Sequence, residues 1–430
     1  MRRALFWLLA TTTLLGGQLA AAGPAAADPG RLDPSFGTAG KTTTSFAGDA
    51  GASAAVLQDG KVVAAGFAVT GATTDFALTR YRPNGTLDPT FGNHGRVTTD
   101  ISGGAGDQAT ALAVQADGKL VAAGLTSGAA GQDFALVRYR PNGTLDATFG
   151  NQGRVTTDFA GGADAAHALV VQADGKLVAA GSATVGANQD FAIARYNRNG
   201  TPDLSFGTGG RVTVDIAGAF DEARALVIQG GKLVAAGFTF TGDAATGDFA
   251  LARVIAAGRP DGTFGTGGRV TTDFAGGFDD ARALVVQGGK LVAAGGATTG
   301  SGPDFALARY DDHGSLDPTF GTGGKATTDF ASVFGDADEI NALVVQQGKL
   351  VAAGSSFTGG GLRFDFALAR YRQNGDLDAT FGTGGSTTTD FARREDRAQA
   401  LILQGGKPVA VGSAVSGSGK QTFALARYLT

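Results

Sequence analysis

One peptide, which begins Asp-Phe-Ala-Leu and ends Ala-Arg-Tyr, recurs seven times with small variations along this chain of 430 residues. Successive copies lie 56 to 61 residues apart, counted between their arginines: Arg80, Arg138, Arg195, Arg253, Arg309, Arg370 and Arg427. A period this long and regular indicates one supersecondary unit copied along or around an axis. The repeat therefore predicts the architecture of the chain, but it reveals no reaction and no ligand.

Each repeat contains four short runs that are typical of β-strands. In the unit that starts at residue 268, they are Arg-Val-Thr-Thr, Ala-Leu-Val-Val-Gln, Lys-Leu-Val-Ala-Ala-Gly and Asp-Phe-Ala-Leu-Ala-Arg-Tyr. The runs are bounded by Gly, Asn and Asp and are mostly too closely spaced for helices. With 71 glycines and 11 prolines, long helices would be poorly supported. The sequence therefore predicts an all-β chain.

Seven units of four strands predict a seven-bladed β-propeller of about 57-residue repeats. The last repeat ends with the run 423–428 and lacks one strand, whereas the first repeat begins with the run 40–44. We expect this N-terminal strand to pair with the last blade and close the ring. An open β-solenoid is the alternative, but it would need polar capping repeats that we do not find in the sequence.

Three signatures together, Leu-Asp-x-x-Phe-Gly, Gly-Lys-Leu-Val-Ala-Ala-Gly and Asp-Phe-Ala-Leu-Ala-Arg-Tyr, resemble the delta-60 repeats of bacterial exported proteins over about residues 32–428. The resemblance implies a secreted, propeller-like protein without an assigned biochemical activity. It carries over no functional residues, because the shared pattern consists of structural positions. Val254 replaces the tyrosine of the third signature, Thr422 replaces its aspartate, and Pro408 interrupts the last apolar run.

The first 27 residues differ from the repeats. Arg2 and Arg3 precede an apolar stretch over residues 4–15, and Ala25-Ala26-Ala27 offers a small-residue cleavage site. This pattern is typical of a secretory signal peptide and is too short for a membrane span. We therefore predict a signal peptide over residues 1–27, a single seven-repeat propeller domain over residues 28–430, and secretion.

Composition argues against several classes of function. A net charge of −4 and the absence of a Lys/Arg run argue against nucleic-acid binding. The chain has no cysteine, so an exported form would depend on packing instead of disulfides. Its three histidines, His94, His167 and His313, fall in different repeats and in predicted loops, so they give no convergent metal site.

One series of carboxylates recurs at a fixed place, eight residues before the glutamine that ends the first strand: Asp107, Asp164, Asp221, Asp279, Asp338 and Asp396. If that strand is innermost, we expect these acids to ring one mouth of the central channel. Nearby carboxylates repel one another unless cations compensate, and oxygen-rich loops favour Ca²⁺. The competing interpretation is that each aspartate caps its own Gly-rich turn or pairs locally with residues such as Arg224 and Arg282. We expect no other cofactor.

Variation is concentrated in the loops between the second and third strands and in the loops between blades. In a meander these loops emerge on one face, and variable loops on a rigid ring suit ligand binding. The opposite face carries the near-identical Asn-Gly and Phe-Gly loops. Phe240, Phe364 and Arg394 are the anchors that we predict on the variable face.

We therefore expect a monomeric binding or structural module, and not an enzyme, whose partner is an extracellular protein or a glycan. The alternative is an extracellular hydrolase or lyase with acidic residues at the channel mouth, using Asp338, Glu339 or Asp396 as acid or base. A deep pocket lined by residues that break the repeat would favour the enzyme.

Overall fold

The computed structural model describes residues 28–128, 131–218, 220–240, 246–300, 302–330, 338–357, 363–392 and 394–430. The predicted signal peptide, residues 1–27, lies outside the described residues. So do parts of the variable loops: residues 241–245, 331–337 and 358–362.

The described residues form seven four-stranded sheets and no helix. In blade order, from the innermost strand of each blade outward, the strands are β2 (Ala50–Gln58), β3 (Lys61–Thr70), β4 (Thr73–Tyr81) and β5 (Arg96–Thr99); β6 (Asp107–Val114), β7 (Leu120–Gly128), β8 (Gly131–Tyr139) and β9 (Arg154–Thr157); β10 (Asp164–Val171), β11 (Leu177–Val185), β12 (Asn188–Tyr196) and β13 (Arg211–Val214); β14 (Asp221–Gln229), β15 (Lys232–Phe240), β16 (Gly247–Val254) and β17 (Arg269–Thr272); β18 (Asp279–Gln287), β19 (Lys290–Thr298), β20 (Pro303–Tyr310) and β21 (Lys325–Thr328); β22 (Glu339–Gln346), β23 (Lys349–Phe357), β24 (Phe364–Tyr371) and β25 (Ser386–Thr389); β26 (Asp396–Gln404), β27 (Lys407–Val415), β28 (Gln421–Arg427) and β1 (Lys41–Thr44).

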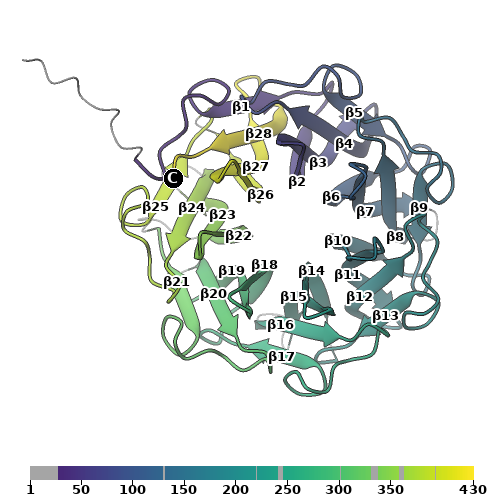
Figure 1. Ribbon diagram of the computed structural model, residues 1–430, viewed down its shortest axis with the longest axis vertical. Helices are drawn as coiled ribbons and strands as arrows, with labels where there is room; N and C mark the ends of the chain where they lie inside the picture. The colour runs from purple at the N-terminus through teal and green to yellow at the C-terminus, as the bar shows by residue number, and fades with distance from the viewer. Residues whose placement is uncertain are drawn as a thin grey trace, which may run out of the picture.

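These sheets are the blades of a closed β-propeller, numbered 1 to 7 in that order (Figure 1). Each is an antiparallel meander whose first strand lies next to the central opening and whose fourth strand lies at the rim. β1 pairs with β28, with Lys41 opposite Ala426 and Thr44 opposite Phe423. The predicted closure by the N-terminal strand is therefore confirmed, and the open solenoid is wrong.

The apolar core lies between neighbouring blades. One cluster joins Phe134 of blade 2 to Leu177 of blade 3, and both side chains are fully buried. Each sheet is thus covered on both faces, which explains why its strands are almost continuously apolar. Tyrosine hydroxyls also join the blades: Tyr310 in blade 5 donates to Thr272 Oγ1 in blade 4 at 2.8 Å.

The recurring arginine is a structural residue. In blade 5, Arg309 Nε donates to Asp317 Oδ2 at 2.7 Å, and the guanidinium carbon lies 4.6 Å from the centre of the Phe320 ring. Burial alone would raise the pKa of Asp317, but hydrogen bonds from Lys290 and Thr319 and the charge of Arg309 lower it below its ordinary value. The same arrangement occurs seven times and fixes the Phe-Gly loop of every blade.

Each innermost strand contains a β-bulge. In blade 2 the register shifts between Ala109 and Ala111, so Thr110 is an extra residue without a cross-strand partner. A side chain on Gly124, the facing residue of β7, would place its Cβ 1.9 Å from the carbonyl oxygen of Gln108. The glycine that ends the Lys-Leu-Val-Ala-Ala-Gly run is therefore required by the bulge. The bulge residues of the seven blades are Ser53, Thr110, His167, Arg224, Arg282, Asn341 and Gln399.

Candidate functional site

The three predicted anchors lie at separate places on the variable-loop face. Phe240 ends β15 in blade 4, Phe364 begins β24 in blade 6, and Arg394 is exposed in the segment between β25 and β26. The structure gives Phe240 and Phe364 different neighbours, so they belong to two distinct groups.

Phe240 belongs to a group of four phenylalanines that we call the blade-4 aromatic cluster: Phe220, Phe238, Phe240 and Phe278. Five pairs of their ring centres lie 5.5 to 5.8 Å apart. Phe220 and Phe278 come from the segments that enter blades 4 and 5, and Phe220 is 38% exposed. Aromatic rings in such offset and edge-to-face arrangements attract one another, and the cluster leaves an apolar surface toward solvent.

Phe364 packs on Phe357, with ring centres 5.6 Å apart. The guanidinium carbon of Arg397 lies 3.8 Å from the centre of the Phe364 ring, and Arg397 Nε donates to Glu395 at 2.8 Å. The arginine that the structure places against Phe364 is therefore Arg397, and the role of Arg394 as a ligand anchor stays a prediction. Contact of this kind contributes of the order of 0.5–1 kcal/mol when it is exposed.

A chain of ionisable side chains runs along the inner strands of blades 3 to 6, and we call it the bulge chain: His167, Glu222, Arg224, Asp280, Arg282 and Glu339. His167 Nε2 lies 3.5 Å from Glu222, which also binds Arg224 Nε at 2.9 Å. Arg224 then pairs with Asp280 across the blade junction.

The chain continues from blade 5 into blade 6. Arg282 binds Asp280 at 2.7 Å and pairs with Glu339. Burial lowers the pKa of His167 more than the charge of Glu222 raises it. The guanidinium carbon of Arg224 also lies 4.8 Å from the centre of the Phe238 ring, so this chain borders the aromatic cluster.

The six predicted metal ligands begin, or in the case of Asp338 directly precede, the innermost strands, but they do not face one another as a ring. All are at most 1% exposed. Each caps the segment that enters its own blade: Asp107 accepts a hydrogen bond from the backbone N–H of Ile101 at 2.6 Å, and Asp221 accepts one from Ile216 at 2.6 Å. These hydrogen bonds agree with the capping interpretation, and metal binding stays a prediction. Five of the six aspartates each lie close to two aspartates of the preceding blade.

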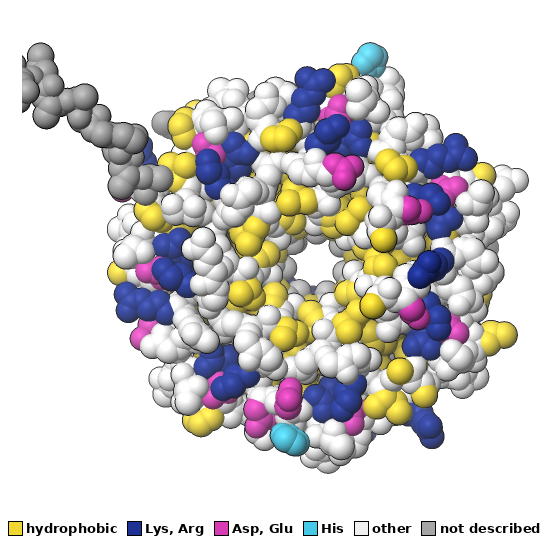
Figure 2. Space-filling model, viewed as in Figure 1, with side chains coloured by type: hydrophobic (Ala, Val, Ile, Leu, Met, Phe, Trp, Pro, Cys, Tyr) yellow, Lys and Arg dark blue, Asp and Glu magenta, His cyan; other side chains and the backbone are white. Residues whose placement is uncertain are grey.

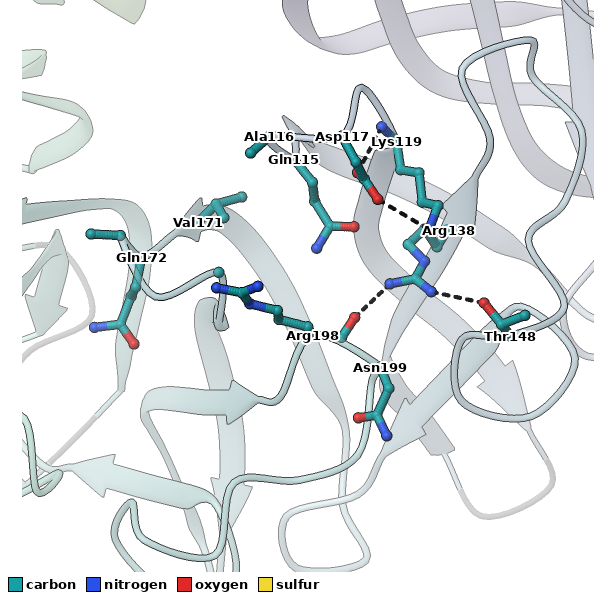
Figure 3. Close-up of a pocket in the computed structure, with 12 residues that line it drawn as sticks. Gln115, Ala116, Asp117, Lys119, Arg138, Thr148, Val171, Gln172, Arg198 and Asn199 are labelled. Carbon is teal, nitrogen blue, oxygen red and sulfur yellow. Dashed lines mark hydrogen bonds and ion pairs between the residues drawn. The ribbon is translucent and has the colours of Figure 1, made fainter.

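A cavity of about 430 Å³ lies between blades 2 and 3 on the Asn-Gly loop face (Figure 3). In blades 2 and 3 the first hairpin has one residue more than in the others, and Oε1 of Gln115 and of Gln172 is buried without a hydrogen-bond partner. In blade 1, by contrast, Gln58 donates to the carbonyl oxygen of Gly118 in the next blade at 2.6 Å. The longer turns therefore open this cavity.

Figure 2 shows hydrophobic side chains around the central opening and Lys and Arg beside Asp and Glu farther out. Val114 and Val286, both on innermost strands, are each 36% exposed. In the part of the chain that the structure describes, there is no helix long and apolar enough to cross a membrane.

Sequence reasoning missed Phe220 and Phe278. It named His167, Arg224, Arg282 and Glu339 but not the chain that connects them, in which the two arginines pair with Glu222, Asp280 and Glu339 instead of with the six aspartates. It placed His167 in a loop, whereas His167 is the bulge residue of β10. Comparing repeats position by position could have found these residues, because Gly106 and Ala163 stand where blade 4 has Phe220.

Five of the seven repeats match a family model described as "Domain of unknown function (DUF5122) beta-propeller", at residues 57–91, 115–149, 172–206, 289–320 and 348–381. The chain carries repeats of a β-propeller repeat family. These propeller repeats each run from the end of the first strand to the Phe-Gly loop. No curated protein matches the chain in sequence.

Solved structures with a similar fold share little sequence with the chain. One is from the Drosophila Plexin A complex with Semaphorin 1b (10% identity, TM-score 0.48, covering 92% of this chain and 88% of that chain). Another is Chaetomium thermophilum Sqt1 bound to the N-terminus of ribosomal protein L10 (12%, 0.44, 87% and 96%). A third is the α-L-arabinofuranosidase Arb93A of Fusarium graminearum (13%, 0.45, 74% and 91%). Similarity at this level carries no information about function.

Proposed function

We propose that this protein is an exported β-propeller that acts as a binding scaffold for an extracellular protein partner, which it engages with the variable-loop face. The resemblance to delta-60 repeats of bacterial exported proteins and the signal-peptide pattern of residues 1–27 support export. The seven repeated Arg-Asp-Phe contacts hold the ring rigid, as a scaffold for that face requires.

The blade-4 aromatic cluster is the observation that carries the proposal. Its exposed member, Phe220, stands where four other repeats have Asp49, Gly106, Ala163 and Glu395, so packing of the repeat does not require an aromatic residue there. Exposed aromatic side chains bordered by arginine and carboxylates are typical of protein interfaces, where a few aromatic and arginine residues supply most of the binding energy. Arg224 and Glu222 supply such a border.

A protein partner fits these residues better than a glycan does. Sugar-binding surfaces usually stack Trp or Tyr rings, and all six tyrosines are fully buried, with hydroxyls such as that of Tyr371 bonded inside the ring. The phenylalanines of the cluster offer apolar contact without a hydroxyl for sugar hydrogen bonds.

The surroundings of the predicted acid and base residues favour the binding scaffold over the enzymatic alternative. Glu339 is paired with Arg282, and Asp338 and Asp396 are buried at blade junctions instead of opening into a shared pocket. General acid–base catalysis needs such a group within reach of substrate. An extracellular hydrolase or lyase remains the second prediction from the sequence.

The test is a binding screen of the mature protein against secreted proteins and against a glycan array, followed by affinity measurements on variants. Phe220→Ala should weaken binding of the partner found by about thirtyfold or more, because truncating an interface anchor costs about 2 kcal/mol or more. Leu204→Ala is the matched control, since Leu204 is 78% exposed on the opposite face. A partner that binds Phe220→Ala normally and Leu204→Ala poorly would refute the proposed face.

A further inference from the structure

The cavity between blades 2 and 3 lies where the bonding of a repeated glutamine changes. In the other five blades, Nε2 of this glutamine donates to a carbonyl oxygen in the first hairpin of the next blade. The five donors are Gln58, Gln229, Gln287, Gln346 and Gln404. Among the described residues, Gln115 and Gln172 make no such bond, and Oε1 of each is buried without a partner. At the wall of the cavity, both groups of the Gln115 amide are thus without a partner in the described part of the chain.

Arg198, on the blade-3 side of the cavity, is a second departure from the repeat. Blades 1 and 2 have Pro83 and Pro141 at this position, and the position is not basic in blades 4, 5 and 6 either. Nε of Arg198 donates to the backbone carbonyl of Asp174 in the long hairpin at 2.6 Å. No carboxylate of the described residues forms an ion pair with Arg198, so most of its five N–H donors are left for another partner. Figure 3 shows its guanidinium beside the same space as the amide of Gln115.

The charged groups at the cavity have an excess of one positive charge. Lys119 Nζ lies 3.0 Å from Asp117 and 3.4 Å from Asp146, and Arg138 Nε lies 2.9 Å from Asp146. Two basic groups thus balance two carboxylates, and Arg198 adds a third basic group. Arg138 is 5% exposed, and the backbone carbonyl of Arg198 accepts from its Nη1, so the segment that carries Arg198 is held in place. An uncompensated guanidinium beside a cavity favours an anionic ligand.

We propose that this cavity binds a sugar acid, a molecule of monosaccharide size that carries one carboxylate and several hydroxyl groups. A volume of about 430 Å³ is typical of small-molecule sites, which commonly have about 300–1,000 Å³. The guanidinium of Arg198 matches a carboxylate, which can accept two parallel N–H bonds. A hydroxyl group both donates and accepts, so it satisfies the amide of Gln115.

The wall of the cavity also contains apolar surface for the C–H groups of a sugar ring. Val171, Ala116 and Ala173 supply it, and the two alanines belong to the longer hairpins of blades 2 and 3. The site lies on the Asn-Gly loop face, opposite the blade-4 aromatic cluster. The proposal is therefore independent of the proposed protein partner.

The test is isothermal titration calorimetry of the mature protein with D-glucuronate and D-galacturonate, and with glucose and acetate for comparison. A sugar acid should bind about tenfold or more tightly than glucose, which lacks the carboxylate, and than acetate, which lacks the hydroxyls. A uronic-acid trisaccharide distinguishes the two sources of this chemistry. Binding as tight as that of the monosaccharide indicates the end of an acidic polysaccharide, and weaker binding indicates a free sugar acid.

Two variants restore features that other blades already have. Arg198→Pro introduces the residue found at Pro83 and Pro141, so it should fold normally and weaken binding of the sugar acid about tenfold or more. Deletion of Ala116 leaves the turn Gln-Asp-Gly-Lys that blade 1 has at residues 58–61, and it should close the cavity and abolish binding.

Arg140→Gln is the matched control, because Arg140 is exposed in the equivalent loop of blade 2 and does not line the cavity; it should bind as wild type. Thermal melting checks that each variant is folded, and Arg198→Pro alone suffices if the deletion variant does not fold. Absence of heat with both sugar acids at millimolar concentration, equal affinity for glucose, or unchanged affinity in Arg198→Pro would overturn the proposal.

Discussion

Replacing Asp317 by asparagine should destabilise the ring more than any exposed charge change. Asp317 is 4% exposed, and its Oδ2 accepts from Arg309 Nε at 2.7 Å and from Lys290 Nζ at 2.6 Å. Asparagine can keep the hydrogen bonds from Thr319 through its oxygen, but its NH₂ group would face the two cationic donors. Arg309, 5% exposed, would then be a buried charge without its counter-ion, which costs about 3–5 kcal/mol.

The assay is urea unfolding followed by far-UV circular dichroism, with the midpoint compared between variants. Arg31→Ala is the matched control, because it removes an Arg–Asp pair whose side chains are 73% and 72% exposed and should cost less than about 0.5 kcal/mol. The double variant Arg309→Met with Asp317→Leu should lose less than Asp317→Asn alone, since no buried charge is left unpaired. A loss below about 1 kcal/mol for Asp317→Asn would refute this account of the repeated pair.

Further outcomes follow from the same contacts. Asp317 and its six equivalents in the other blades have pKa values lowered in the folded state, to about 2 for Asp146. Their stabilisation is present above the ordinary value near 4 and should be lost as the pH falls from about 4 through 2, which acid unfolding would detect. Deleting residues 28–46 removes β1, exposes the edge of β28 and should produce aggregates in size-exclusion chromatography; an unchanged monomer with wild-type melting would contradict closure by this strand. Gly295→Ala should cost about 1–3 kcal/mol or more in urea unfolding, because its Cβ would lie 1.7 Å from the carbonyl oxygen of Asp280, whereas Gly296→Ala, with 3.5 Å to its nearest atom, should be tolerated.

The architecture could be predicted because the same strand and turn signals recur in every repeat. Blade number, strand order and closure follow from the period and from the strand that the last copy lacks, and the pairing of Arg309 with Asp317 follows from two positions that recur together. These features depend on contacts within one repeat or between similar repeats, so every copy gives the same evidence for them.

The grouping of three aspartates at five of the blade junctions was only partly predictable. The series that contains Asp221 was visible, but its companions Asp190 and Asp215 lie on other strands of the preceding blade, so a ring of one residue per blade was expected at the channel mouth. The six aspartates are buried at the blade junctions, so they do not form such a ring. The joint absence of all three carboxylates at Thr422, Ser45 and Ala50 was the signal in the sequence that connects the three series.

The bulge explains why the non-repeating chemistry lies on blades 3 to 6. The bulge in blade 4 lies between two alanines, in Ala-Arg-Ala, where neither periodicity nor turn residues mark a register shift, so the sequence does not predict it. The extra residue has no cross-strand partner to satisfy, and its side chain can therefore change from Ser53 to His167 or Arg224 without altering the ladder. Because the bulge lies near the start of each innermost strand, this freedom falls beside the segments that carry Phe220 and Phe278. The bulge that each repeat preserves thus gives every innermost strand a position at which the repeats can differ, in addition to the variable loops, and the bulge chain and the aromatic cluster lie at this position and near it.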